Sequence, residues 1–407
     1  CCRFLYNHFL SYRKSQYEQG NKVSYYMTQK ELTKMKAISQ YSWLNEVASQ
    51  SLQMAIQQLD DAYKRFFRQQ GGYPKFKTKH ESVQSCSFPQ RVMLEGNRVF
   101  LPKFMKNGIK INIHRELPEG ASIKQATISK KNNRYYVSIS FDDNMPTPKP
   151  VIAQSSIGLD VGINSLVATS KDVKIANPRY TKKYARMLKL ASRHLDRKQH
   201  SKKKGDTTPK SKRYLKQQLK VARIHEKIAN LRSDYIHKIT NEITNQYDVI
   251  CIEDLNVKGM IKNHKLSKHI ADVAWGELRR QLEYKSERKG KILIKVDRWL
   301  PSSQTCSSCL SSTGKKPLNI RTFTCPVCGV THDRDNNAAK VIEYYGLLQF
   351  YELGLQHNLS AGTVDYTRGG PSGGDGDSIP IVAPSSHGSV KREAHTYKVR
   401  VVHAIVS

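Results

Sequence analysis

Three acidic residues occupy positions where a folding chain rarely places a charge. Asp160 lies within the apolar run SIGLDVGINSLVATS, Glu253 ends the apolar part of YDVICIEDL, and Asp335 opens an expected helix in THDRDNNAAKVI. Burying an unpaired carboxylate costs several kcal/mol, so such an acid is usually paired, hydrogen-bonded or bound to a metal. The pattern favours a metal-binding carboxylate cluster, although each acid alone fits equally well a strand end in contact with water.

The chemistry of such a cluster is that of a phosphodiesterase. Carboxylates at neighbouring strand ends, joined by one from a helix, supply the oxygen ligands that Mg²⁺ prefers. Two such ions about 4 Å apart activate water and stabilise a leaving phosphate oxygen. The order strand, hairpin, helix, strand around the acids predicts a ribonuclease-H-like α/β domain. Asp254 and Asp333 are rival ligands, but Asp254 should point to the opposite strand face and Asp333 is expected to cap a helix.

Four cysteines have the spacing of a structural zinc site. They form two C-x-x-C pairs separated by fifteen residues: Cys306, Cys309, Cys325 and Cys328. This spacing predicts one Zn²⁺ held by four thiolates, which would stabilise a loop too short to have a core of its own. Disulfides are the alternative interpretation. Since the pairs fall between Glu253 and Asp335, the zinc ribbon is expected to be an insertion in the catalytic domain.

The composition indicates a polyanionic partner. The chain has 407 residues, 38% of them hydrophobic, and a formal net charge of +34. Such a length allows two or three domains, and such a charge disfavours compaction unless an anionic partner, most plausibly nucleic acid, neutralises it. A membrane surface is the competing polyanion, but no apolar stretch approaches the ~18 residues of a spanning helix. No signal-peptide pattern opens the chain, and we expect a soluble, intracellular protein.

The positive charge is concentrated in one region. Residues 180–223 hold sixteen Lys and Arg against two acids, and HSKKKGDTTPKSK should divide the region into two helices. A solvated helix face is the simpler interpretation, but like charges at helical spacing repel one another unless phosphates lie nearby. We therefore predict nucleic-acid contacts for six cations here: Lys182, Lys183, Arg186, Lys189, Arg193 and Arg197.

Changes in pattern along the chain divide it into segments. We expect helices at 1–83, an antiparallel β-barrel-like domain at 84–150, an α/β nuclease domain at 151–305 and 331–357, a zinc ribbon at 306–330, and a disordered tail at 358–407. Asn132 and Asn133 resemble a hairpin turn, and the proline-rich residues 145–154 a linker. The tail is too poor in apolar residues to fold. Its last residues, YKVRVVHAIVS, could form a strand, but nothing in the sequence identifies a partner for it.

These motifs resemble those of TnpB, the transposon-encoded RNA-guided DNA nucleases related to CRISPR type V effectors. GLDVGINSLVATS, IEDLNVKGM and THDRDNNAAKVI resemble the three RuvC motifs, and PSSQTCSSC, FTCPVCG and VAWGELRRQLEYK resemble the segments around them. The resemblance implies that Asp160, Glu253 and Asp335 bind two catalytic Mg²⁺ ions, in preference to Asp333. It also implies that the four cysteines hold one structural Zn²⁺.

The earlier part of the chain is similar to the family in a looser way. RFLYNHFL, WLNEVASQSLQMAIQQLDDAYKRFF and YPKFK resemble the helical recognition domain, and the β-rich stretch resembles the wedge domain. Tyr25 and Gln53 align with positions that contact a short duplex motif beside the target. Family members normally begin earlier than Cys1, so we expect the first wedge strand to be missing, with target-motif reading and guide-RNA docking in doubt.

The resemblance implies a specific reaction in a bacterial or archaeal cytoplasm, at the nucleoid. A guide RNA from the transposon end would pair with the target, the protein would read an adjacent motif, and the RuvC site would cut both strands of double-stranded DNA in support of transposon maintenance. A heteroduplex of about 20 base pairs has some 40 phosphates, which a strongly basic protein can neutralise without reading a base. Two alternatives stay open: an RNA-guided DNA-binding regulator that no longer cuts, and a transposase that joins DNA ends.

Overall fold

The computed structural model describes residues 1–78, 83–146, 148, 152–198, 210–263, 267–317, 319–352 and 400–406. It forms two compact units, one of Cys1–Met145 with His387–Ser407 and one of Pro146–Ser386. The boundary falls in the proline-rich segment that the sequence predicts to be a linker. Among the described residues, no helix has both the length and the apolar character required to cross a bilayer.

The first unit begins with helices, as the sequence predicts. They are α1 (Cys2–Glu18), α2 (Tyr25–Ala37), the 3-10 helix η1 (Ser39–Glu46) and α3 (Ser49–Phe67). Residues of α3 spaced by three and four, Leu52, Ile56 and Leu59, are fully buried and share a core with α1. An ion pair of 2.9 Å between Arg13 and Asp60 also joins these two helices. The apolar stripe therefore packs the helices into one module.

The second part of this unit is an antiparallel sheet of seven strands in the order β1-β5-β6-β14-β4-β3-β2. Its strands are β1 (Val83–Phe88), β2 (Met93–Glu95), β3 (Arg98–Phe100), β4 (Ile109–Ile113), β5 (Ser122–Lys131), β6 (Arg134–Asp142) and β14 (Arg400–Val406). Asn132 and Asn133, with φ of 49° and 61°, connect β5 to β6. Two consecutive residues with positive φ are typical of a type I′ hairpin turn, so the predicted turn is confirmed.

Strand β14 corrects the prediction that residues 358–407 form a disordered tail. It pairs with β6 from Arg400 opposite Phe141, and with β4 from Ala404 opposite Ile113. Its sequence RVVHAIV is rich in β-branched residues, and its place between β6 and β4 gives both strands a hydrogen-bonding neighbour. The prediction of disorder was wrong for these residues because it followed the composition of the whole segment, whereas the partners that order this short strand lie far away in the sequence. The rest of the predicted tail lies outside the described residues.

The second unit contains a mixed sheet of five strands in the order β11-β10-β7-β8-β9. Strands β7 (Ser156–Val161), β8 (Ser165–Thr169) and β9 (Lys174–Ala176) are antiparallel, whereas β10 (Val249–Glu253) pairs parallel with both β7 and β11 (Ile292–Val296). Side chains alternate between the two faces of these strands. Ile157 and Ile252 therefore face one helical layer, while Gly158 and Cys251 face the other.

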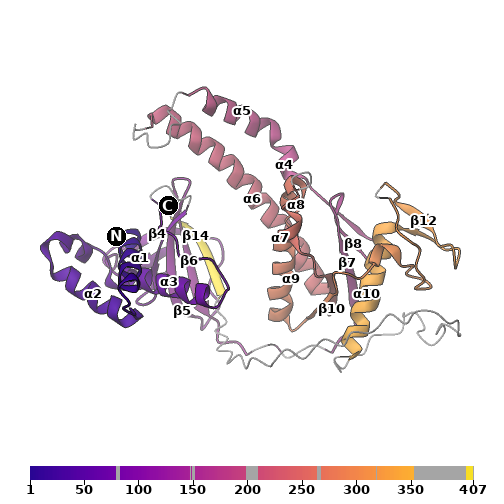
Figure 1. The fold of residues 1–407 in the computed structure, drawn as a ribbon, viewed down its shortest axis with the longest axis horizontal. Helices are drawn as coiled ribbons and strands as arrows, with labels where there is room; N and C mark the ends of the chain where they lie inside the picture. The colour runs from indigo at the N-terminus through magenta and orange to yellow at the C-terminus, as the bar shows by residue number, and fades with distance from the viewer. Residues whose placement is uncertain are drawn as a thin grey trace. The chain divides into compact units, whose positions relative to one another are not determined.

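Helices cover both faces of this sheet (Figure 1). One face packs against α6 (Lys212–Gln246), α8 (Ser267–Val273) and α9 (Trp275–Lys289), and the other against α10 (Arg334–Glu352). The remaining elements are α4 (Tyr180–Lys183), α5 (Ala185–Asp196), α7 (Val257–Met260), the 3-10 helix η2 (Ser302–Gln304), β12 (Thr322–Thr324) and β13 (Thr331–Asp333). The unit is therefore the mixed α/β domain that the sequence predicts.

The basic region contains the short helix α4 and two longer helices that lie side by side, α5 and the beginning of α6 (Figure 1). They share a small core in which Ala191 of α5 packs with Ile224 and Ile228 of α6. Gln217 of α6 also donates a hydrogen bond of 2.8 Å to the carbonyl of Ala191. The prediction of two helices is confirmed, while residues 200–209, which are most of the predicted break, lie outside the described residues.

A glycine on β7 allows α10 to lie unusually close to the sheet. A Cβ atom at Gly158 would collide with the carbonyl oxygen of Ala339 and lie 2.7 Å from the backbone nitrogen of Glu343. We expect Gly158→Ala to lower the free energy of unfolding by about 3 kcal/mol, because the backbone of α10 must move away. Urea denaturation of both proteins measures this change.

The matched control is Gly276→Ala in α9, where an added Cβ has no atom within 4 Å. Alanine favours a helix over glycine by at most about 1 kcal/mol, so this variant should be as stable as the wild type or slightly more stable. Equal effects of the two substitutions would contradict the close packing of α10 on β7.

Candidate functional site

Asp160 and Glu253 lie at the C-terminal ends of β7 and β10, and Asp335 lies in the first turn of α10. In the parallel ladder, Ile252 pairs with Leu159, so Glu253 follows beside Asp160. Helix α10 runs antiparallel to β7: Ala339 lies over Gly158, and Glu343 accepts a 2.6 Å hydrogen bond from Ser156.

This register also positions the third acid. Four helical residues span about 6 Å, and two strand residues span about 6.6 Å. One turn before Ala339 is Asp335, and two residues after Gly158 is Asp160. Asp335 therefore lies at the end of β7 where Asp160 and Glu253 are found.

The electrostatics of the three acids agree with this placement. Burial, followed by the charges of Glu253 and Asp335, raises the pKa of Asp160 well above its ordinary value, against the opposing effects of Arg334 and Lys174. Burial also raises the pKa of Glu253, partly offset by a 2.7 Å hydrogen bond from the Ser302 hydroxyl. Among the described residues, no donor hydrogen-bonds the Asp160 side chain. Divalent cations would remove the repulsion between Asp160 and the other two acids. Among the described residues, the four cysteines and not these acids are grouped closely enough for their ligand atoms to hold one metal ion.

This repulsion predicts a dependence of stability on pH in the metal-free protein. Because the pKa of Asp160 is raised in the folded state, the folded protein binds more protons than the unfolded chain, and stability falls as pH rises from near 3.8 through the raised pKa. Asp160→Asn removes this contribution, so the variant should be more stable than the wild type at neutral pH. Thermal unfolding at several pH values, without divalent metal, measures the difference. A stability difference that is constant between about pH 4 and pH 8 would contradict the placement of Asp160.

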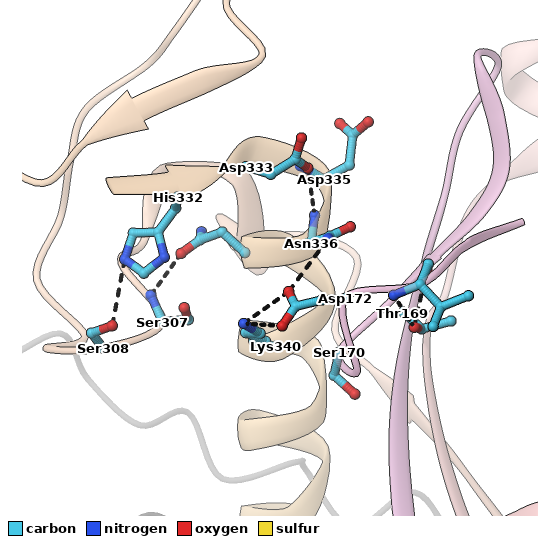
Figure 2. A network of polar contacts seen from close by, with 12 residues as sticks. Thr169, Ser170, Asp172, Ser307, Ser308, His332, Asp333, Asp335, Asn336 and Lys340 are labelled. Carbon is cyan, nitrogen blue, oxygen red and sulfur yellow. Dashed lines mark hydrogen bonds and ion pairs between the residues drawn. The ribbon is translucent and has the colours of Figure 1, made fainter. Parts of the chain in front are cut away.

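The two rival acids have structural roles, as the sequence suggests. Asp333 accepts hydrogen bonds of 3.1 Å from the backbone nitrogens of Asp335 and Asn336, and so caps α10 (Figure 2). Burial raises its pKa, but the 2.7 Å hydrogen bond from Lys174 and the capping bonds outweigh burial and lower it. Asp254 is held by Arg298 at 2.6 Å and by Arg279, and these arginines lower its pKa.

The acids have basic and hydroxyl neighbours that could not be identified in the sequence. Lys174 of β9 approaches Asp335 to 3.7 Å, and Arg321 approaches it to 3.5 Å. The Ser302 hydroxyl donates a hydrogen bond to Glu253. No spacing rule identifies these residues, because each reaches the site only through the tertiary fold. Lys and Arg are also too frequent in this chain for any one of them to attract notice.

The four predicted cysteines come together in the ribbon. Their sulfur atoms all lie within 4.8 Å of one another. The Sγ atoms of Cys306 and Cys328 are 3.7 Å apart, as are those of Cys309 and Cys325. A Zn–S bond of about 2.3 Å in a tetrahedron gives sulfur atoms about 3.8 Å apart, so these residues fit one zinc ion. All eight cysteines are free thiols, so the alternative of disulfides is not supported.

The ribbon also brings a histidine to the zinc ligands. The Nε2 atom of His332 lies 3.2 Å from the Sγ atom of Cys306 and 3.4 Å from the Ser308 hydroxyl (Figure 2). A thiolate bound to zinc commonly accepts hydrogen bonds from such neighbours, which orient it. His332 is not among the residues predicted from the sequence, although its position beside the C-x-x-C pairs was a signal that could have indicated a role.

The predicted nucleic-acid contacts lie in both units. The six cations of the basic region that are predicted to contact nucleic acid are all exposed, on α4, on α5 or at the end of α5. None of them forms an ion pair with another described residue. We call these six the basic helix surface: Lys182, Lys183, Arg186, Lys189, Arg193 and Arg197. In the other unit, Tyr25 is half-buried at the start of α2, and Gln53 is exposed on α3. The nucleic-acid contacts of these residues stay predictions.

Family models match three parts of the chain. The model described as "Probable transposase" covers residues 135–264, the model described as "Cas12f1-like, TNB domain" covers 275–342, and the model described as "Helix-turn-helix domain" covers 1–22. The first two together include Asp160, Glu253, Asp335 and the four cysteines. The matched regions therefore contain every residue predicted to bind a metal.

Two curated relatives extend the match over most of the chain. A protein of Streptomyces pristinaespiralis, named "Putative RNA-guided DNA endonuclease", is 36% identical over 349 residues, which are 85% of this chain and 84% of that protein. InsQ of Escherichia coli K12, which carries the same description, is 31% identical over 364 residues, 84% of this chain and 85% of that protein. Among solved structures, Cas12f1 in a complex with sgRNA and target DNA has a similar fold. Its TM-score is 0.52 at 15% identity, and the match covers 84% of this chain and 80% of that one.

Proposed function

Because the chain belongs to the TnpB family of RNA-guided DNA endonucleases, we propose that it cuts double-stranded DNA at sites selected by a guide RNA from a transposon end. The main support is the convergence of Asp160, Glu253 and Asp335 at one end of a mixed sheet, where each of the other two acids raises the pKa of Asp160. A ribonuclease-H-like RuvC domain has carboxylates at such strand ends. The biological role that we propose is maintenance of the transposon.

The three carboxylates would hold two Mg²⁺ ions. When bound, these ions supply an activated water and stabilise the leaving phosphate oxygen. The residues of the chain arrange the ligands: the Ser302 hydroxyl orients Glu253, and the cap by Asp333 fixes the first turn of α10, from which Asp335 projects. Lys174 and Arg321 reduce the negative charge around Asp335, which favours the approach of a DNA phosphate.

The partners follow from charge and from the family. The net charge of +34 and the unpaired basic helix surface support binding of the guide RNA and of its heteroduplex with target DNA. We propose that the helical module at 1–83 and the sheet domain that follows serve as the recognition and wedge domains, and that Tyr25 and Gln53 read a short motif beside the target. The ribbon would contribute one structural zinc ion through its four cysteines.

The test is a cleavage assay with the purified protein, its guide RNA and a supercoiled plasmid that carries the target. Linear plasmid should form with Mg²⁺ and guide, and should be absent when EDTA is added or when ribonuclease removes the guide before target addition. Specific binding of the target without any cut would favour a DNA-binding regulator. Joined strands formed without RNA would favour a transposase. Either result would overturn the proposal.

A further inference from the structure

A buried amide is one of the connections between the zinc ribbon and the helix that carries Asp335. Asn337 is 1% exposed; its Oδ1 accepts a 2.8 Å hydrogen bond from the backbone nitrogen of Ser307, and its Nδ2 donates one of 2.7 Å to the carbonyl of Thr305. These two backbone groups flank Cys306, the first predicted zinc ligand. Figure 2 shows Ser307 and His332 beside the first turn of α10, with Asp335 on the same turn. The Asn337 side chain therefore connects the backbone on both sides of Cys306 to α10, two residues after Asp335.

The same segment supports a second carboxylate. Ser302, which lies four residues before Cys306 and is 6% exposed, donates the 2.7 Å hydrogen bond to Oε1 of Glu253. A third connection runs from Cys306 to His332, which immediately precedes the helix cap Asp333. Residues 302–307 therefore contact Glu253 through Ser302, and they contact the helix of Asp335 through Asn337.

The ribbon depends on its metal for its own order. Its only strands among the described residues, β12 and β13, are three residues each, and the buried hydrophobic side chain that they contribute is Phe323 of β12. A segment this small gains its fold from metal binding. Without zinc, Thr305 and Ser307 would be released from Asn337, and Ser302 would no longer be held against Glu253.

We propose that zinc binding and divalent-metal binding are coupled in this protein, with Asn337 and Ser302 as the positioning residues. Zinc orders residues 302–307, and this segment holds Glu253 and the first turn of α10 in the geometry that binds Mg²⁺. The coupling is reciprocal, so occupation of the carboxylate site also favours retention of zinc. This inference deepens the proposed function and rests on it, because it concerns the same carboxylates.

Binding of Mn²⁺ to the protein without nucleic acid tests the coupling. The signal of free Mn²⁺ in electron paramagnetic resonance gives the affinity, and atomic absorption gives the zinc content. We expect removal of zinc by a chelator to weaken Mn²⁺ binding at the carboxylates by tenfold or more. Asn337→Ala and Ser302→Ala should each weaken it by about tenfold, as supporting residues of metal ligands typically do. Ser302→Thr, which keeps the hydroxyl, should restore most of the affinity.

The matched control is Asn7→Ala in the other unit. Asn7 also makes two hydrogen bonds with a backbone segment. Its Oδ1 accepts one from the nitrogen of Lys77 and its Nδ2 donates one to the carbonyl of Lys77, each at 2.8 Å. Its replacement removes a similar pair of hydrogen bonds but should leave Mn²⁺ and zinc binding unchanged. A general loss of stability would affect metal binding in all three alanine variants alike, and would overturn the specific role of Asn337 and Ser302.

The outcomes separate the inference from the proposed function. If the zinc-loaded protein binds Mn²⁺ no better than its Asp160→Ala variant, the carboxylate site itself is wrong and the proposed function fails. If it binds Mn²⁺ through Asp160 with the same affinity with and without zinc, only the coupling is overturned. If Asn337→Ala cannot retain zinc, Ser302→Ala decides, because Ser302 contacts Glu253 and no cysteine: unchanged affinity would overturn the inference.

Discussion

Asp160→Ala is expected to reduce guided DNA cleavage by at least about a thousandfold, because loss of one ligand from a two-metal site removes roughly 4 kcal/mol of transition-state stabilisation. Binding of the guide RNA and of the target should be unchanged, since the side chain faces α10 and the other acids and lies in the other unit from Tyr25 and Gln53. Single-turnover cleavage rates at saturating Mg²⁺ measure the loss, and gel-shift titrations measure binding.

The control for this experiment is Asp254→Asn. Asp254 adjoins Glu253, is acidic and is bound by Arg279 and Arg298, so its replacement removes a similar charge close to the site. Partly exposed ion pairs of this kind contribute at most about 1 kcal/mol each, so the variant should be slightly less stable and should still cut DNA. Cleavage by Asp160→Ala at a rate near that of the wild type, or an equal loss in Asp254→Asn, would show that the assigned acids are not the catalytic ones.

The residues that could be predicted from the sequence are those whose local surroundings are chemically unusual. Asp160 and Glu253 stand out because strands as apolar as β7 and β10 must pass through the protein interior, where a carboxylate needs a partner. The cysteines stand out because two C-x-x-C pairs seldom occur by chance. The preference for Glu253 over Asp254 relies on alternation along a strand, but β10 ends at Glu253, so alternation does not place Asp254; its two arginine partners are found only in the structure.

The supporting residues could not be predicted, because their partners are close only in space. Ser302 lies forty-nine positions from Glu253, and Asn337 lies thirty from Ser307. Serine and asparagine occur at many surface positions. No local sequence pattern distinguishes a buried side chain that hydrogen-bonds to distant groups from a solvated one. The same reason explains strand β14, whose sequence allows a strand but whose partners β6 and β4 lie more than two hundred residues earlier. Long-range pairing in this fold is decided by packing rather than by local pattern.

Neutralising the basic helix surface is expected to weaken binding of a guide RNA–DNA heteroduplex by about a thousandfold at moderate ionic strength, because each lost phosphate contact reduces the release of counterions. Changing all six of its cations to alanine should also reduce the slope of log affinity against log salt by roughly 4. Fluorescence anisotropy titrations over a range of salt concentrations measure both quantities.

A control variant removes six cations that already have an acidic partner. They are Lys14, Lys34, Lys64, Lys124, Lys238 and Arg280. Both variants lose the same formal charge, so they differ in whether the removed cation is available to a phosphate. If affinity depended on net charge alone, both variants would weaken binding equally, and the assignment of the basic helix surface would be wrong. A much larger effect in the first variant would instead indicate that phosphates contact α4 and α5, which explains why so many like charges persist at helical spacing without acids to balance them.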